Sequence, residues 1–185
     1  KKGILETLIV LFLGGYIDLR FGDEVGFSLE PNVPYGWIRK GEQRGIPSKK
    51  GGNLNVFGLL NLLGELSTYQ TTGSINSTVI IECIDDFSKG LKKTTIIVLD
   101  NAPWHLSNEV KQKVKEWAKQ GLFIFYLPPY SPHLNIIETL WRKIKLEWLK
   151  PEDFENKEKL HQAISNILKN YNNDDFKIEF SINLS

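Results

Sequence analysis

Methionine is absent from the 185 residues, cysteine occurs once, and no apolar run reaches the ~20 residues that a membrane span needs. The single cysteine, Cys83, excludes an internal disulfide framework and fits a reducing compartment. Because methionine is missing even at position 1, we expect a piece of a longer chain or a processed start. The opening KKGILETLIVLFLGG imitates a signal peptide, but Glu6 interrupts its apolar run and no A-x-A-like cleavage site follows.

The net charge is close to zero. With 23 Lys+Arg against 22 Asp+Glu, the net charge of +1 does not by itself indicate a nucleic-acid binder. Residues 151–185 hold four lysines and seven acidic residues, so the positive excess lies in residues 1–150. A basic segment over 39–50 is either a solvated loop or a contact for DNA phosphate. Its cations are Arg39, Lys40, Arg44, Lys49 and Lys50.

Hydrophobic periodicity and turn residues predict a run of strands followed by alternating helices and strands. Helices are expected over 2–13, 75–87, 107–120, 132–149 and 156–171, and strands over 16–23, 35–37, 54–60, 65–70, 95–99 and 122–127. We expect the strands over 54–60 and 65–70 to form a hairpin. This order predicts one α/β domain over 1–185, with residues 1–15 as a leading helix and a mixed central sheet covered by helices on both faces.

Acidic residues stand at the ends of two predicted strands. Asp23 is in phase with the apolar positions of 16–23, and Asp100 directly follows 95–99. If these strands are parallel neighbours, the two carboxylates converge and need a compensating charge. A divalent cation that prefers oxygen ligands, Mg²⁺ or Mn²⁺, supplies it. The alternative is that each aspartate only caps a turn.

A third carboxylate lies on the helix expected over 132–149. At about 100° per residue, Glu138 falls at the rim of the apolar stripe, and Arg142 and Lys145 share its flank. Glu138 can lean over the sheet edge toward the aspartates while the two cations face a docked ligand. The alternative is a solvated helix flank with a Glu–Arg pair at i, i+4.

Three segments together resemble the catalytic domain of DDE transposases of the mariner-like superfamily, in particular its bacterial insertion-sequence branch. They are FGDEVGFSLEPNVPYGW, IIVLDNAPWH and YLPPYSPHLNIIETLWRKIK, and the resemblance covers about residues 15–180. It implies an RNase H-like fold with Asp23, Asp100 and Glu138 as the catalytic triad. It also implies metal-dependent DNA cleavage and strand transfer in the transposition of an insertion sequence, with two Mg²⁺ or Mn²⁺ ions held by these acids.

Three residues near the predicted triad each have two alternative roles. His105, where the family often has histidine, touches the scissile phosphate or makes a structural hydrogen bond. Asn101 supports a metal ligand or a turn, and Asn135 caps or braces the glutamate helix. Glu24 is expected to face away from the site because strand residues alternate. Three tryptophans are expected in the core rather than against bases: Trp37, Trp104 and Trp141.

The resemblance implies DNA as the partner, both element ends and target, with a homodimer in the active complex and a cytoplasmic location at the bacterial nucleoid. Arg142, Lys145 and the basic segment 39–50 are the expected phosphate contacts. Only about 15 residues precede the first strand, too few for the helix-turn-helix module that such proteins carry before it. The alternatives are a remnant that only binds DNA or dimerises, and an RNase H-like nuclease without strand transfer.

Overall fold

The computed structural model describes residues 2–30 and 53–180, so the basic segment 39–50, Trp37 and the strand expected over 35–37 lie outside the described residues. Five strands form one sheet in the order β3-β2-β1-β4-β5. They are β1 (Asp18–Phe27), β2 (Leu54–Leu60), β3 (Leu66–Thr71), β4 (Thr95–Leu99) and β5 (Leu122–Tyr126). The hairpin neighbours β1, β2 and β3 pair antiparallel, whereas β1 with β4 and β4 with β5 pair parallel. The mixed sheet is therefore confirmed.

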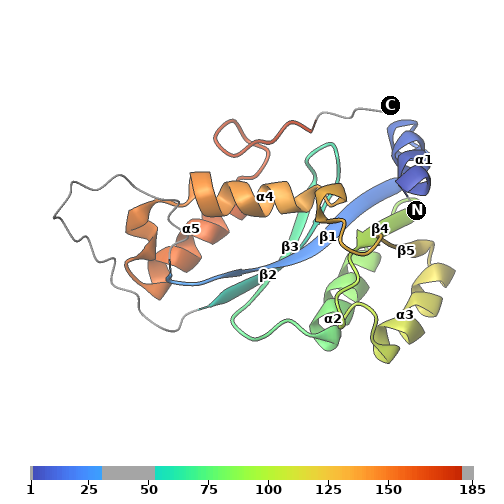
Figure 1. Cartoon of the computed structure of the whole chain (residues 1–185), viewed down its shortest axis with the longest axis horizontal. Helices are drawn as coiled ribbons and strands as arrows, with labels where there is room; N and C mark the ends of the chain where they lie inside the picture. Colours follow the sequence, from blue (N-terminus) through green and yellow to red (C-terminus); the bar gives the residue numbers. More distant parts are fainter. Residues whose placement is uncertain (1, 31–52, 181–185) are drawn as a thin grey trace.

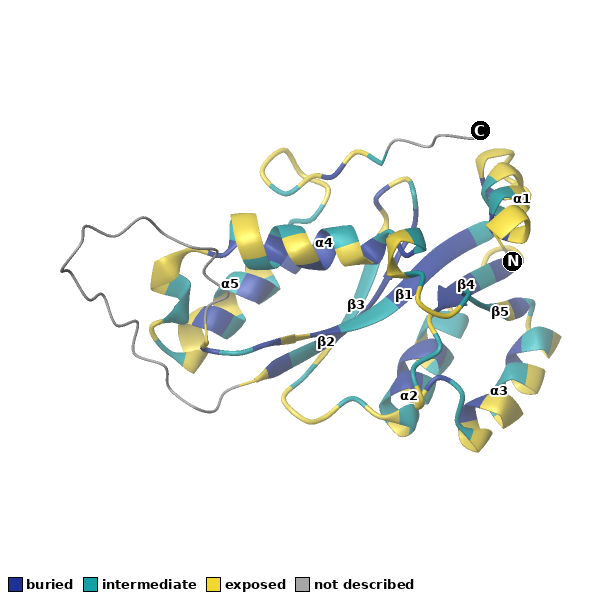
Figure 2. Cartoon of the chain, in the orientation of Figure 1, coloured by how far each residue is buried: buried dark blue, intermediate teal, exposed yellow. Residues whose placement is uncertain are grey.

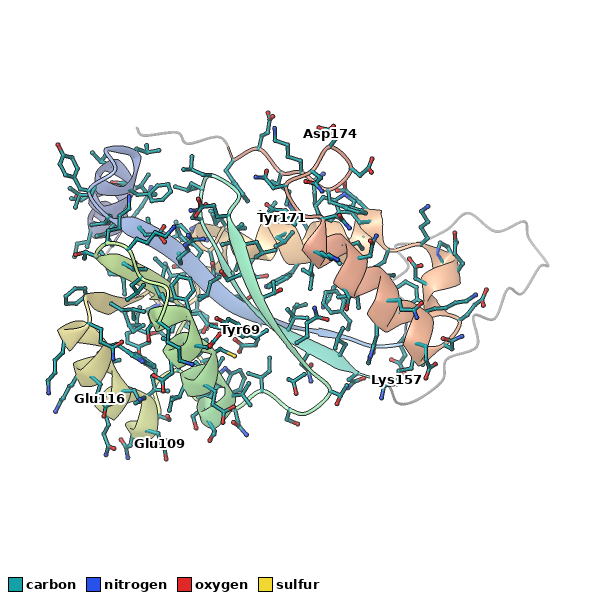
Figure 3. The ribbon with its side chains drawn as sticks, turned by 180° about the vertical axis from the view of Figure 1, so that it is seen from behind. Tyr69, Glu109, Glu116, Lys157, Tyr171 and Asp174 are labelled. Carbon is teal, nitrogen blue, oxygen red and sulfur yellow. The ribbon has the colours of Figure 1, made fainter. Side chains whose placement is uncertain are left out.

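Helices cover both faces of this sheet, as Figure 1 shows. One face carries α1 (Lys2–Leu13), α4 (Ile137–Lys143) and α5 (Lys157–Lys169), and the other carries α2 (Ser77–Ser88) and α3 (Asn108–Lys119). Each helix turns its buried residues to the sheet and its exposed residues outward (Figure 2). On α3, for example, Trp117 is buried while the labelled Glu109 and Glu116 point away from the sheet (Figure 3).

Local signals fix where the helices begin and end. The side chain of Asn76 accepts a hydrogen bond from the Val79 amide and caps α2, and Ser107 caps α3 in the same way. Gly121, with φ of 84°, follows α3 and leads into β5. Within residues 2–30 and 53–180, no helix is long and apolar enough to cross a membrane.

The first strand is longer than the sequence predicted. β1 continues to Phe27, because its second half pairs antiparallel with β2, from Asp23 opposite Gly58 to Phe27 opposite Leu54. The expectation that the strand ends at Asp23 was therefore wrong. Asp23 lies in the middle of β1, at the point where the shorter β4 ends beside it.

The continuous helix expected over 132–149 was also wrong. A 3-10 turn over Pro132–Leu134 is followed by Asn135 in an extended conformation, with φ of −98° and ψ of 100°. The α-helical part, α4, then gives way to a π-helical turn over Ile144–Trp148. The break at Asn135 separates α4 from the proline-rich segment before it.

The contact between α4 and β2 depends on a residue without a side chain. A Cβ added to Gly58 would lie 2.8 Å from the Trp141 ring and 2.9 Å from Cδ1 of Ile137. Both neighbours are buried, and the tryptophan ring is rigid. Gly58 therefore lets α4 pack directly on the sheet, and the position of every residue on that helix depends on this close approach.

We expect Gly58→Ala to destabilise the protein by about 1–3 kcal/mol, because the added methyl group forces α4 away from β2. At roughly 2–4 °C per kcal/mol for a chain of this size, thermal unfolding should show a clear fall in Tm. Gly3→Ala is the matched control, since a Cβ at Gly3 meets nothing within 4 Å. An unchanged Tm for Gly58→Ala would contradict this packing argument.

Candidate active site

Parallel pairing of β1 with β4 brings two acidic residues to the same level of the sheet. Phe21 pairs with Val98, and Asp23 and Asp100 each lie two residues further along their chains. The sequence made their convergence conditional on β1 and β4 being parallel neighbours, and that condition is confirmed. Asp100 itself is exposed, just past the end of β4.

Asp23 lies in an unfavourable electrostatic environment. Burial, as the largest cause, and the nearby charges of Glu24, Glu138 and Asp100 together raise the pKa of its carboxyl group to about 8. These acids are therefore close enough for each to oppose ionisation of Asp23. A cation among them would remove that cost.

Glu138 lies near the two aspartates but on a helix, α4, instead of on the sheet. It lies in the first turn of α4 and borders two cavities of about 420 Å³ each. Asp100 and Asn135 line one cavity, and Asp23 lines the other. All three predicted triad members thus lie around one region between the sheet and α4.

The same acids do not form a closed set of metal ligands. Within residues 2–30 and 53–180, no group of three His, Cys, Asp or Glu side chains stands close enough together to hold an ion. The donors still suit a hard cation, because the three predicted ligands offer only carboxylate oxygens.

Two asparagines connect the segments that carry these acids. Asn135 is buried, and its Nδ2 donates a 3.1 Å hydrogen bond to the carbonyl of Gly22, beside Asp23. Asn101 donates a 2.7 Å hydrogen bond through Nδ2 to the carbonyl of Leu127, after β5. The hydrogen bond of Asn135 is of the bracing kind, and it ties the start of α4 directly to β1.

His105 is fully buried and fixes one oxygen of Asp100. Its Nδ1 lies 2.8 Å from Oδ1 of Asp100, which also accepts a 2.9 Å hydrogen bond from the Ala102 amide. The hydrogen bond with His105 lowers the pKa of Asp100. Burial alone would lower the pKa of His105, but Asp100 and Glu24 outweigh it and raise that pKa to about 9. His105 thus makes a structural hydrogen bond, one of the two roles that the sequence suggested.

Glu24 and Trp104 differ from their sequence-based predictions. Oε2 of Glu24 lies 3.3 Å from Nε2 of His105, and its Oε1 accepts a 2.6 Å hydrogen bond from Nε1 of Trp104. Glu24 is therefore linked to Asp100 through His105, although strand alternation had placed it outside the site. Trp104 is 37% exposed and not a core residue, whereas Trp141 is buried as predicted. The adjacency of Asp23 and Glu24 was the only sequence signal for this link.

Arg142 and Lys145 line the same cavity as Asp23 and Glu138, as their shared helix flank predicted. Arg142 is exposed, and Nζ of Lys145 lies 5.6 Å from the centre of the Phe27 ring. Positive and acidic side chains therefore line the same cavity.

We expect Asp23→Asn to stabilise the metal-free protein more at pH 8 than at pH 6. The folded chain keeps a proton on Asp23 that the unfolded chain loses above 3.8, so its cost to stability grows with pH and levels off above about 8. The advantage of the variant should grow by at most about 1.4 kcal/mol per pH unit. Thermal unfolding in EDTA across this range measures it.

Asp174→Asn serves as the control for this comparison, because Asp174 lies on the exposed loop after α5 (Figure 3). Its unfolding curve should follow that of the unmodified protein at each pH. If the stability of Asp23→Asn and of the unmodified protein changed with pH in parallel, the pKa of Asp23 would not be raised in the folded protein.

Known proteins resemble this chain in sequence or in fold. An insertion element IS630 protein of 39 kDa from Shigella sonnei is 26% identical over 141 residues, which are 67% of this chain and 36% of that protein. The Mos1 mariner paired-end complex with Mg superposes with a TM-score of 0.66 at 16% identity, over 95% of this chain and 55% of that one. The Mos1 strand transfer complex gives 0.61 at 15% identity, over 91% and 52%.

These relatives identify the sheet and its helices as an RNase H-like fold, and this chain spans only about a third of the IS630 protein. The family model for the DDE superfamily endonuclease matches residues 18–161, most of the chain, from the start of β1 into α5. The chain therefore belongs to the DDE superfamily of endonucleases.

Proposed function

We propose that this chain is the catalytic part of an insertion-sequence transposase, which cuts a DNA phosphodiester and joins the freed 3′-OH to a target strand. The observation that carries the proposal is the gathering of Asp23, Asp100 and Glu138 between the sheet and α4. The Mos1 complexes, which include a strand transfer complex, support the proposed reaction class.

Asp23, Asp100 and Glu138 are the residues that would hold two divalent ions, Mg²⁺ or Mn²⁺. When bound, such ions activate the attacking oxygen and stabilise the leaving oxygen of an in-line displacement at phosphorus. Since His105 and the Ala102 amide occupy Oδ1 of Asp100, its Oδ2 is the oxygen left to face an ion. Glu24 keeps His105 in place from the opposite ring nitrogen.

Arg142 and Lys145 would contact DNA phosphates beside the acids, and the basic segment 39–50 is a further phosphate contact suggested by sequence alone. Such contacts position a strand without reading its sequence. The proposal includes a homodimer that acts on element ends and target DNA at the bacterial nucleoid, and the paired-end complex of Mos1 supports its contact with element ends.

We expect Asp100→Asn to lower Mn²⁺-dependent nicking of supercoiled plasmid at least about 100-fold while leaving the Tm of the metal-free protein close to normal. The amide keeps the shape of the side chain but loses the charge that an ion needs. Agarose gels measure nicking, and joining of a labelled oligonucleotide to the plasmid measures strand transfer. Asp174→Asn is the matched control and should retain both reactions (Figure 3).

The two reactions also separate the alternative functions. Nicking without joining would indicate an RNase H-like nuclease that lacks strand transfer. DNA binding with neither reaction would indicate an inactive remnant and would contradict the proposed function. Substantial Mn²⁺-dependent nicking by pure Asp100→Asn protein would contradict the role assigned to this residue.

We expect DNA binding to weaken steeply with salt and to show no preference for a particular duplex sequence. Each phosphate that the protein neutralises contributes about −0.9 to the slope of log affinity against log salt. Arg142→Ala and Lys145→Ala should each reduce the magnitude of that slope by roughly one unit. Lys119→Ala, at the end of α3 on the opposite face of the sheet, should leave the slope unchanged.

Fluorescence anisotropy with two duplexes of equal length and different sequence measures both properties. Unchanged slopes for Arg142→Ala and Lys145→Ala would remove these residues from the DNA path. A strong preference for one duplex at ~150 mM salt would show that the chain reads base sequence directly.

A further inference from the structure

Tyr130 is the most exposed large side chain among the hydrophobic and aromatic residues of the described ranges. Its relative exposure is 101%, compared with 75% for Tyr16 and 37% for Trp104. The ring therefore has almost no contact with the rest of the fold. A single exposed aromatic residue is common on protein surfaces, so its meaning depends on its backbone and its neighbours.

The backbone of Tyr130 has the left-handed conformation, with φ of 56°. Asn172 is the only other residue besides glycine with positive φ in the part of the chain that the structure describes. Asparagine tolerates this conformation, but an aromatic residue adopts it only at a cost in free energy. Glycine would satisfy the same turn without that cost, so the fold alone does not account for a tyrosine here.

Prolines flank Tyr130 on both sides. Pro128 and Pro129 precede Tyr130, and Pro132 opens the 3-10 turn that follows it. Within the turn, Oγ of Ser131 donates a 3.3 Å hydrogen bond to the Pro129 carbonyl, and the Ser131 carbonyl accepts one of 3.1 Å from the Leu134 amide. The ring is thus presented to solvent from a segment whose neighbouring backbone positions are restricted.

The ring also stands at a specific place. Tyr130 lines the cavity of about 420 Å³ that contains Asp100, Asn135 and Glu138, two of which are predicted triad members. A DNA strand whose phosphodiester enters this cavity places the adjoining base next to the cavity wall. Aromatic side chains beside a strand bind bases through their flat faces, and this contact tolerates any base sequence.

We propose that Tyr130 stacks on an unpaired or terminal base of the DNA strand whose phosphodiester enters the cavity of Asp100 and Glu138. The inference rests on the proposed function, because it assumes that this cavity receives DNA. It adds a base contact to the phosphate contacts of Arg142 and Lys145. This contact requires no base sequence, but it requires a base that is free to leave the duplex stack.

The test uses the full chain and a duplex whose 3′ overhang carries 2-aminopurine, a fluorescent base that aromatic stacking quenches. We expect the unmodified protein to quench the probe, and Tyr130→Phe and Tyr130→Trp to retain the effect. Tyr130→Ala should lose the quenching and weaken binding roughly 5- to 150-fold. Its salt slope should not change, because stacking releases no counterions.

Two further variants separate binding from folding. Tyr130→Gly relieves the left-handed strain, so it should keep or raise the Tm while it loses quenching as Tyr130→Ala does. Tyr16→Ala removes the other strongly exposed tyrosine, which lies between α1 and β1, and should change neither property. A protein that is at least as stable but binds the overhang less tightly has lost a contact to DNA rather than to its own core.

The outcomes distinguish this inference from the proposed function. If the chain nicks plasmid but Tyr130→Ala binds and quenches normally, the stacking contact is wrong and the catalytic proposal stands. If Tyr130→Ala changes the oligomeric state in analytical ultracentrifugation, a second copy covers the ring and the inference is overturned. If no DNA reaction occurs with any divalent ion, the catalytic proposal itself fails.

Discussion

The parallel pairing of β1 with β4 is the constraint on which the site depends. Side chains alternate along a strand, so a register shift of one residue would turn Asp23 to the α2 and α3 face of the sheet and expose Phe21 there. Burial of apolar residues on both faces prevents such a shift, since Phe21, Val98 and Leu99 are almost completely inaccessible. The packing of the core therefore fixes the level at which Asp23 and Asp100 meet.

Ionisation of Asp23 is unfavourable where β1 and β4 lie side by side. Burial and neighbouring acids raise the pKa of Asp23, whereas the hydrogen bond with His105 lowers the pKa of Asp100. Asn101 and Asn135 add hydrogen bonds that hold the acidic segments without adding charge. Neutral amide donors and one histidine therefore hold the segments that carry Asp23 and Asp100.

Sequence patterns predicted the elements better than their contacts. The strand over 95–99 and the helix over 2–13 agree with the structure, because unbroken or periodic apolar residues determine them locally. The break at Asn135 was missed because it depends on a hydrogen bond to Gly22, a residue far away in the chain. The link from Glu24 to His105 was missed for the same reason. The resemblance to DDE transposases, which the family match confirms, supplied the pairing of the aspartate strands that periodicity left open.

The hydrogen bond from Asn135 to Gly22 gives α4 an attachment of its own to the sheet. It anchors α4 to β1 just before Glu138. The proline-rich turn between β5 and Asn135 packs separately, because Leu127 belongs to the core cluster beside β1 and β4 and Leu134 packs against it. The segment that carries Tyr130 and the helix that carries Glu138 are thus attached to the sheet through different contacts.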